Sequence, residues 1–341
     1  MKKPLLLLSI LFILVSCNKS NDIKDFNEKL IEIVKYNSLY SDSLNWPLIE
    51  KEIDSISNLK QNVDKYTVSV NYIISKLRVV GDNHTNYSSK EYANKLTQQN
   101  CINLQPECKY LGCNIAYIKV PAFASINDSI CYDFATKIQL LIKTLDSNSI
   151  NGWIVDLRDN GGGNMYPMIA GLGPLTGEGV LGYFIIKKGL KRSWSYRNGI
   201  ATDSLTEILI KKNGRNKSIS SYSNIAGMPQ VAHPYTIKTK NAKIAVLINN
   251  HTASAGEMTC ISFIGKPNTK LFGEASGGYT TANTTFMLPD SSCIHLAASF
   301  TADRNMNEFH GKIIPDVIIN NDFYYDDRCL NEAIKWLKSS K

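Results

Sequence analysis

The sequence predicts an α/β fold with an N-terminal helical subdomain, and two patterns in its 341 residues support this. Apolar residues recur at helical spacing between residues 22 and 82, as in amphipathic helices. From about residue 115, short apolar runs alternate with helical segments, and residues 244–248 (IAVLI) are wholly apolar, as in a strand buried on both faces. We therefore expect a tether and helical subdomain over residues 17–100 and a larger α/β domain over residues 101–341.

The first seventeen residues have the features of a bacterial export signal. Two lysines precede an apolar run, Leu5–Val15, which is too short to span a bilayer. The run ends where a small-residue cleavage site is expected, and residues 14–17 (LVSC) resemble a lipobox. We expect residues 1–16 to be a lipoprotein signal peptide and lipidated Cys17 to anchor the protein to a membrane of the cell envelope, facing the periplasm or the surface. An ordinary signal peptide with a nearby cysteine is the alternative.

Charge and cysteine content narrow the class of protein further. The net charge of +8 falls to +6 without the signal peptide, and the basic residues are dispersed except for a cluster in a predicted turn at residues 211–217. No nucleic-acid partner is therefore expected. The seven cysteines beyond Cys17 show no metal-ligand spacing, and their odd number prevents complete pairing within one chain. Only Cys101 and Cys108, which flank a proline-containing loop, suggest a disulfide, and no disulfide framework, metal or cofactor is expected.

The predicted elements of the α/β domain follow a regular order along the chain. We predict strands at residues 115–120, 153–157, 180–186, 193–197, 244–248, 271–273, 284–288, 294–298 and 317–319. Helices are predicted at residues 132–145, after a glycine turn at 161–163, after a turn at 249–252, and at 327–338. The segment between Gly81 and about residue 112 is expected to be a loop. After the strand at 193–197, a long polar insertion is expected up to about residue 240.

One serine lies at a predicted strand-to-helix turn. Strand 244–248 runs into residues 249–257 (NNHTASAGE), which places Ser254 at the C-terminal edge of the sheet. The first N–H groups of a helix lack partners, so a nucleophile at this position would have part of an oxyanion hole in the amide of Ala255. Ser254 and Glu257 also have the spacing of a capping box, which requires no catalysis, and this segment alone leaves both interpretations open.

A glycine turn follows the predicted strand at 153–157. Three consecutive glycines at 161–163 allow backbone amides to approach a ligand closely, which is the geometry that binds an oxyanion. Phosphate-binding loops also use such turns, but no Gly-Lys-Ser/Thr follows and no Gly-x-Gly-x-x-Gly fits across this segment.

Four motifs together resemble those of the tail-specific and tricorn-type serine peptidases. In order they are residues 156–163 (DLRDNGGG), 252–257 (TASAGE), 273–278 (GEASGG) and 315–317 (PDV). The resemblance spans about residues 70 to 320. It implies a ClpP/crotonase-like α/β fold, Ser254 as nucleophile, and an oxyanion hole from the amide of Ala255 and that of Gly162 or Gly161.

The expected general base departs from the tail-specific pattern. Those peptidases use a lysine about 25 residues after the serine, whereas here Tyr279 follows the GEASGG motif. The tricorn-like branch takes a histidine from the N-terminal part, and residues 80–85 (VGDNHT) resemble its motif. The resemblance therefore implies that His84 is the base.

Two further residues are implied by the tricorn-like arrangement, in which a serine precedes the histidine and a glutamate completes a relay. Asn83 stands at the place of the serine, and Glu308 lies one residue out of register before the Pro-Asp motif. His310 is close enough to Glu308 to compete as the base. Only one helix fits between the strands at 115–120 and 153–157, so no PDZ domain is expected.

These expectations define a serine endopeptidase that acts on peptides or proteins without a cofactor. One alternative is an esterase, because residues 252–256 (TASAG) approximate Gly-x-Ser-x-Gly. Another is a catalytically silent protein that binds peptides or lipids on the same fold. The sequence leaves the oligomeric state open, a homo-oligomer included.

Overall fold

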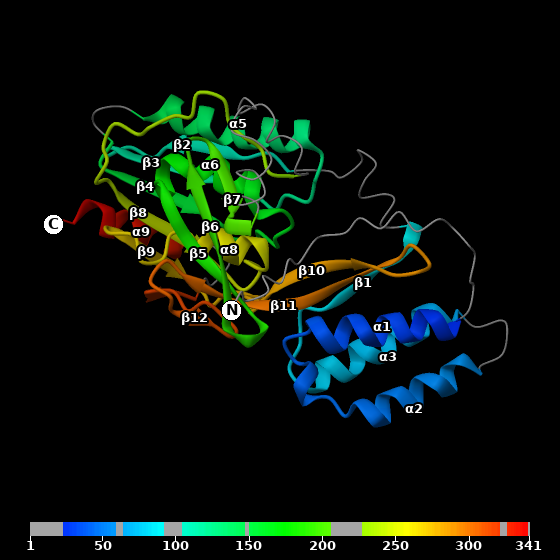
Figure 1. Cartoon of the computed structure of the whole chain (residues 1–341). Coiled ribbons are helices and arrows are strands. Elements are labelled where there is room, and N and C mark those ends of the chain that lie inside the picture. The colour runs from blue at the N-terminus through cyan, green and yellow to red at the C-terminus, as the bar shows by residue number, and fades with distance from the viewer. Residues whose placement is uncertain are drawn as a thin grey trace, which may run out of the picture.

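The computed structural model describes residues 23–58, 64–91, 104–146, 150–205, 227–320 and 326–339. The predicted signal peptide, Cys17 and Cys101 lie outside these ranges. In the described part the chain forms two sheets with helices between and around them, and a separate group of three N-terminal helices (Figure 1). No helix within it is both long enough and apolar enough to cross a membrane.

The N-terminal helices form as their apolar spacing predicts. They are α1 (Ile23–Asn37), α2 (Trp46–Ser57) and α3 (Lys65–Val79), with a 3-10 turn η1 (Ser41–Ser43) after α1. Leu30, Ile53 and Ile73, one from each helix, are fully buried in a common cluster. Helix α3 ends just before Gly81, whose φ of +100° suits glycine and turns the chain toward the functional site.

A six-stranded sheet forms the centre of the α/β domain, with strand order β13-β9-β8-β4-β3-β2. Its strands are β2 (Glu107–Tyr110), β3 (Ile115–Lys119), β4 (Gly152–Asp156), β8 (Lys243–Ile248), β9 (Thr269–Gly273) and β13 (Val317–Ile318). All neighbours are parallel except β2, which is antiparallel to β3. The carboxyl ends of β4 and β8 therefore lie side by side.

Helices cover both faces of this sheet, which explains its continuous apolar strands. On one face lie α5 (Asp128–Leu145), α6 (Met165–Thr176) and α8 (Ala255–Ile261), and on the other lies α9 (Arg328–Lys338). In β8, Ile244, Val246 and Ile248 belong to the core shared with α5, α6 and α8. Ala245 and Leu247 belong to the cluster beneath α9. Burial of both faces produces the apolar run seen in the sequence.

The second sheet is antiparallel and has the strand order β1-β11-β5-β6-β7, with β10 and β12 also paired to β11. Its strands are β1 (Asn86–Ser88), β5 (Gly179–Ile186), β6 (Leu190–Arg197), β7 (Ile200–Asp203), β10 (Ala282–Met287), β11 (Cys293–Asp303) and β12 (Glu308–Phe309). A 3-10 turn, η2 (Lys187–Gly189), joins β5 to β6. The β10–β11 hairpin reaches out over α1 and α3 (Figure 1).

Strand β11 connects the two parts of the molecule. Its first residues pair with β1 and β10, and its last five pair with β5. Ile294 and Leu296 of β11, with Leu288 of the hairpin, pack into the cluster of the N-terminal helices. The helices thus complete their core with side chains that follow them by more than 200 residues.

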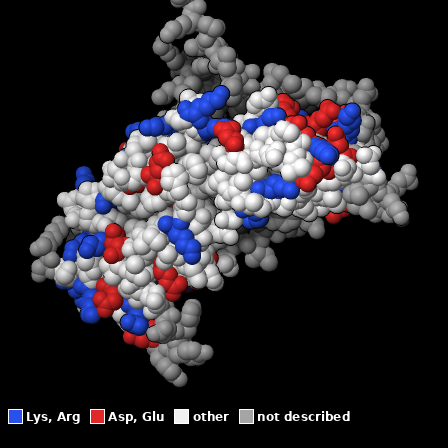
Figure 2. All heavy atoms as spheres, turned by 90° about the horizontal axis from the view of Figure 1, so that it is seen from below, with Lys and Arg blue, Asp and Glu red and all other residues white. Residues whose placement is uncertain are grey.

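The α/β fold with a helical N-terminal region agrees with the prediction, and four short strands were not predicted. Strands β1 and β2 lie in the segment expected to be a loop, β7 lies in the expected insertion, and β12 follows the predicted strand at 294–298. Each has two to four residues and pairs with a single neighbouring strand, so it forms without a recognisable apolar pattern. In the described residues between β3 and β4, α5 is the only helix, and no PDZ-like unit is present. Figure 2 shows acidic and basic side chains mixed on the described surface of one face.

Candidate active site

Ser254 occupies a strained turn between β8 and α8. Its φ of 52° and ψ of −120° lie outside the regions that residues other than glycine normally adopt. The fully buried carboxylate of Glu257 accepts a hydrogen bond from the Ser254 N–H at 2.8 Å, as in a capping box. Such a sharp turn after a strand presents the serine hydroxyl beyond the edge of the sheet.

The hydroxyl of Ser254 meets the imidazole of His84, whose Nε2 lies 3.0 Å from Ser254 Oγ. His84 follows α3 in a short loop that is held by the buried carboxylate of Asp82. This carboxylate accepts hydrogen bonds from the N–H groups of His84 and Thr85, at 3.0 and 2.9 Å. Thr85 Oγ1 in turn accepts the Ala297 N–H of β11 at 3.0 Å. The position of the imidazole is therefore fixed by contacts to both α3 and β11.

The second ring nitrogen of His84 faces Thr281. Nδ1 lies 2.9 Å from Thr281 Oγ1, and the ring of Tyr279 stands edge-on to the imidazole at a centroid distance of 5.4 Å. Burial lowers the pKa of His84, while a backbone hydrogen bond to Thr281 and the charge of Asp82 act in the opposite direction. A histidine with a lowered pKa is neutral at pH 7, and a neutral imidazole can accept a proton from the serine.

The glycine turn after β4 lies directly against the turn that carries Ser254. A Cβ added to Gly162 would lie 2.8 Å from the Ala253 oxygen and 2.9 Å from the Ala255 nitrogen. Gly162 also has a φ of +105°, a conformation that favours glycine. Both requirements explain why this position needs a residue without a side chain.

Three amides are the predicted donors to an oxyanion. No acceptor for the Ala255 N–H is found among the described residues. The Gly162 N–H donates to Asn160 Oδ1 at 3.0 Å, and the Gly161 N–H donates to the Asp159 carbonyl at 3.1 Å. Ala255 is therefore ready to bind an oxyanion, whereas either glycine would first have to exchange its hydrogen bond. The role of these amides stays a prediction.

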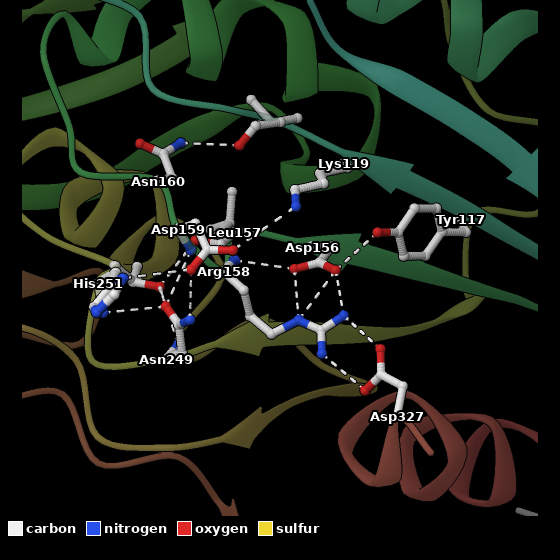
Figure 3. A network of polar contacts seen from close by, with 12 residues as sticks. Tyr117, Lys119, Asp156, Leu157, Arg158, Asp159, Asn160, Asn249, His251 and Asp327 are labelled. Carbon is white, nitrogen blue, oxygen red and sulfur yellow. Dashed lines mark hydrogen bonds and ion pairs between the residues drawn. The ribbon is translucent and has the colours of Figure 1, made fainter. Parts of the chain in front are cut away.

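A reciprocal pair of side-chain hydrogen bonds ties the two turns together (Figure 3). The Asp159 N–H donates to Asn249 Oδ1 at 3.0 Å, and Asn249 Nδ2 donates to Asp159 Oδ1 at 2.8 Å. Thr252 Oγ1 also donates to the Leu157 carbonyl at 2.9 Å. These contacts set the spacing between the Ser254 turn and the glycine turn.

Behind this pair, Arg158 joins the end of β4 to α9 (Figure 3). Its guanidinium donates to Asp156 at 2.6 Å and to both carboxylate oxygens of Asp327 at 2.8 and 2.9 Å. Asp327 also caps α9 by accepting the Leu330 N–H. Planar, bidentate pairing of this kind has a defined geometry, so it fixes the first residues of the glycine motif.

The other predicted site residues lie in different contacts. Glu308 forms an ion pair with His310 at 3.2 Å, and both side chains are exposed. Asn83 is exposed and its carbonyl accepts from Arg78 at 3.1 Å. None of these contacts reaches the His84–Ser254 pair, so the structure brings His84 and not His310 to the serine, while the catalytic roles of Glu308 and Asn83 stay predictions. Within the described ranges, no group of three histidine, cysteine or acidic side chains is arranged to hold a metal ion.

Comparison with known proteins identifies the family to which the chain belongs. Residues 114–319 match the model of peptidase family S41. The chain belongs to this family. It is also similar to the nisin-resistance protein of Lactococcus lactis subsp. lactis, with 32% identity over 303 residues that cover 88% of this chain and 82% of the relative. The predicted resemblance to the tail-specific peptidases is confirmed at the level of the family.

Two solved structures are similar to this chain over most of its length. A lipoprotein from Streptococcus agalactiae is 28% identical, with a TM-score of 0.70 and coverage of 93% of this chain and 96% of that chain. The photosystem II D1 C-terminal processing protease is 13% identical, with a TM-score of 0.54 and coverage of 93% and 97%. The second likeness shows the fold alone.

The contact between the two turns predicts unequal effects of alanine at adjacent glycines. Gly162→Ala is expected to displace the Ser254 turn and to slow the reaction of this serine with a fluorophosphonate by about tenfold or more. The displacement would weaken the hydrogen bond between His84 and Ser254, and the loss of one hydrogen bond corresponds to a factor of about ten in rate. Gly161→Ala is the control, since nothing lies within 4 Å of its added Cβ. Equal labelling rates in the two variants would show that Gly162 does not set the geometry of the nucleophile.

Proposed function

We propose that the protein is a serine peptidase that cleaves peptide bonds through an acyl-enzyme on Ser254, with His84 as the general base. The observation that carries this proposal is the 3.0 Å contact between His84 Nε2 and Ser254 Oγ on a strained turn at the edge of the sheet. Membership of family S41 supports the same reaction class. Fluorophosphonate labelling of the wild-type protein, followed by peptide and ester turnover assays, tests it.

The proposed reaction uses groups that lie around Ser254, and an amide of the glycine turn would first have to leave its present acceptor. Ser254 Oγ attacks the carbonyl carbon while Nε2 of His84 takes its proton. The negative charge on the carbonyl oxygen is stabilised by the Ala255 N–H and by an amide of the glycine turn. The imidazolium then protonates the leaving amine, and the neutral imidazole activates a water that releases the acyl group.

The two catalytic side chains are expected to act as one unit. Ser254→Ala should lower kcat by about four orders of magnitude or more, His84→Ala by a similar factor, and the double variant by little more than either. His310→Ala is the control histidine and should cost little, because it pairs with Glu308 away from the serine. Steady-state kinetics and melting temperatures of all four variants provide the measurement. Retention of most turnover by His84→Ala would assign the base to another residue.

The pH dependence follows from the lowered pKa of His84. Only the neutral imidazole accepts the serine proton, so activity is lost as pH falls through the pKa of this residue. Because burial lowers that pKa, the acid limb of kcat/KM is expected below the ordinary histidine value of about 6.5. An acid limb of kcat/KM well above pH 7 would contradict the assignment of His84 as the base. The assignment would also be wrong if the residual activity of His84→Ala kept the pH profile of the wild type.

The similarity to a nisin-resistance protein makes nisin the first peptide to test as a substrate. An esterase and a silent binding protein are the alternatives. Comparable rates on peptides and on matched esters of the same acyl group would favour a peptidase, and turnover of esters alone would favour an esterase. Absence of both fluorophosphonate labelling and turnover would leave a binding protein.

We also propose that the mature protein is anchored to the bacterial cell envelope through a lipid on Cys17. The lipobox-like residues 14–17 and the similarity to a lipoprotein of Streptococcus agalactiae support this. Cys17→Ala is expected to release the protein into the soluble fraction and to abolish labelling by a palmitate analogue. Cys113→Ser, which changes an exposed cysteine elsewhere, should remain labelled and membrane-bound. Undiminished labelling of Cys17→Ala would overturn the proposal.

A further inference from the structure

We infer that Thr281 is a positioning residue for His84. Its hydroxyl accepts a hydrogen bond from the Nδ1–H group of His84, and this contact directs the unprotonated Nε2 toward Ser254. This inference deepens the proposed function and rests on it where catalysis is concerned. Its basis is geometric: Thr281 Oγ1 lies 2.9 Å from Nδ1, while Ser254 Oγ lies 3.0 Å from Nε2 on the opposite side of the ring. Thr281 is buried, so water competes little for either atom.

The direction of the hydrogen bond at Nδ1 follows from the contact on the opposite side of the ring. A neutral imidazole carries one proton, and the nitrogen that holds it must face an acceptor. A threonine hydroxyl can donate or accept, so the Thr281 contact is compatible with either tautomer. On the other side of the ring, Nε2 must be unprotonated if it is to accept the proton of Ser254, 3.0 Å away, and the single proton of the neutral ring then lies on Nδ1 with the Thr281 hydroxyl as its acceptor. The lone pair of Nε2 is then left for the serine.

The chain on either side of Thr281 is held by hydrogen bonds. On one side, Glu257 accepts the Gly278 N–H at 2.8 Å and the hydroxyl of Ser276, and this same carboxylate accepts the Ser254 N–H at 2.8 Å. On the other side, Asn283 Nδ2 of β10 donates to the His84 carbonyl at 3.0 Å. One buried carboxylate thus connects the nucleophile turn to the loop that carries the partner of the histidine.

A hydroxyl at this position differs chemically from a carboxylate. In the described part of the chain, no carboxylate forms a hydrogen bond with the ring of His84, and Glu308 is paired with His310 instead. A neutral acceptor fixes the tautomer and the orientation of the ring without placing a negative charge beside the imidazolium. Thr281 therefore determines which nitrogen of His84 carries the proton, and the pKa of the imidazole stays low.

The kinetic experiment compares three variants of the full chain with the wild type. Thr281→Val removes the hydroxyl at nearly constant volume, and Thr281→Ser retains it. Thr280→Val is the matched control, because Thr280 loses a similar hydrogen bond, to the Gly311 carbonyl at 2.8 Å, without contacting His84. We expect Thr281→Val to lower kcat by about tenfold with little change in KM, and Thr281→Ser and Thr280→Val to stay within about threefold of wild type. Melting temperatures identify any loss caused by unfolding.

The decisive readout does not depend on activity. In protein labelled with nitrogen-15 histidine, with the signals assigned through His84→Ala, the wild type should show the proton on Nδ1, and Thr281→Val should shift population to the Nε2-protonated form. Thr281→Asp should raise the pKa of His84 and move the acid limb to higher pH, because it adds a negative charge beside the ring.

An unchanged tautomer together with unchanged kcat in Thr281→Val would overturn the inference. A protein that shows the expected tautomer shift but no fluorophosphonate labelling or turnover would support the positioning role and overturn the proposed function. The two proposals are thereby tested separately.

Discussion

The hydrogen bond between His84 and Ser254 joins two turns that are 170 residues apart in the chain, and its length depends on β11. His84 belongs to the loop after the N-terminal helices, while Ser254 follows a strand of the central sheet. Strand β11 pairs with β1 immediately after the histidine loop and with β5 of the larger domain. Its Ala297 backbone bonds both Thr85 and Leu39, which ties the helical region to the same strand. Any rotation of the helices relative to the sheet would separate His84 from Ser254.

Within the larger domain, the topology of the sheet brings the remaining parts of the site together. Strands β4 and β8 are parallel neighbours, so the glycine turn and the serine turn emerge at one edge. The absence of a side chain at Gly162 allows the turns to touch, and the Asp159–Asn249 pair holds them at that distance. The strain at Ser254 is thus supported by a rigid framework, as preorganised electrostatic stabilisation requires.

Much of this arrangement could be predicted from local signals. The apolar run of β8 predicts a buried strand, and the turn after it singles out Ser254. The motif around His84 resembles that of the tricorn-like peptidases, which implied a histidine base. Thr281 could not be predicted, because it lies in a threonine-rich segment and its relation to the imidazole arises only from pairing across β11. Glu308 was expected near the base from its distance to a motif, but a short strand pair with β11 and the ion pair to His310 determine its place. Contacts made between distant segments leave no periodic trace in the sequence.

The sharing of one strand between the two parts also governs how this chain can fold. Phe26 and Ile73 of the helices are buried together with Ile294 and Leu296, so the helical core is incomplete until the last quarter of the polypeptide is available. A high average sequence separation between contacting residues slows folding, because long loops must close before their contacts contribute. A fragment that ends before β11 would expose the apolar sides of its helices to aggregation. The N-terminal region is therefore an integral part of a late and cooperative folding step, and the contact between His84 and Ser254 forms only when that step is complete.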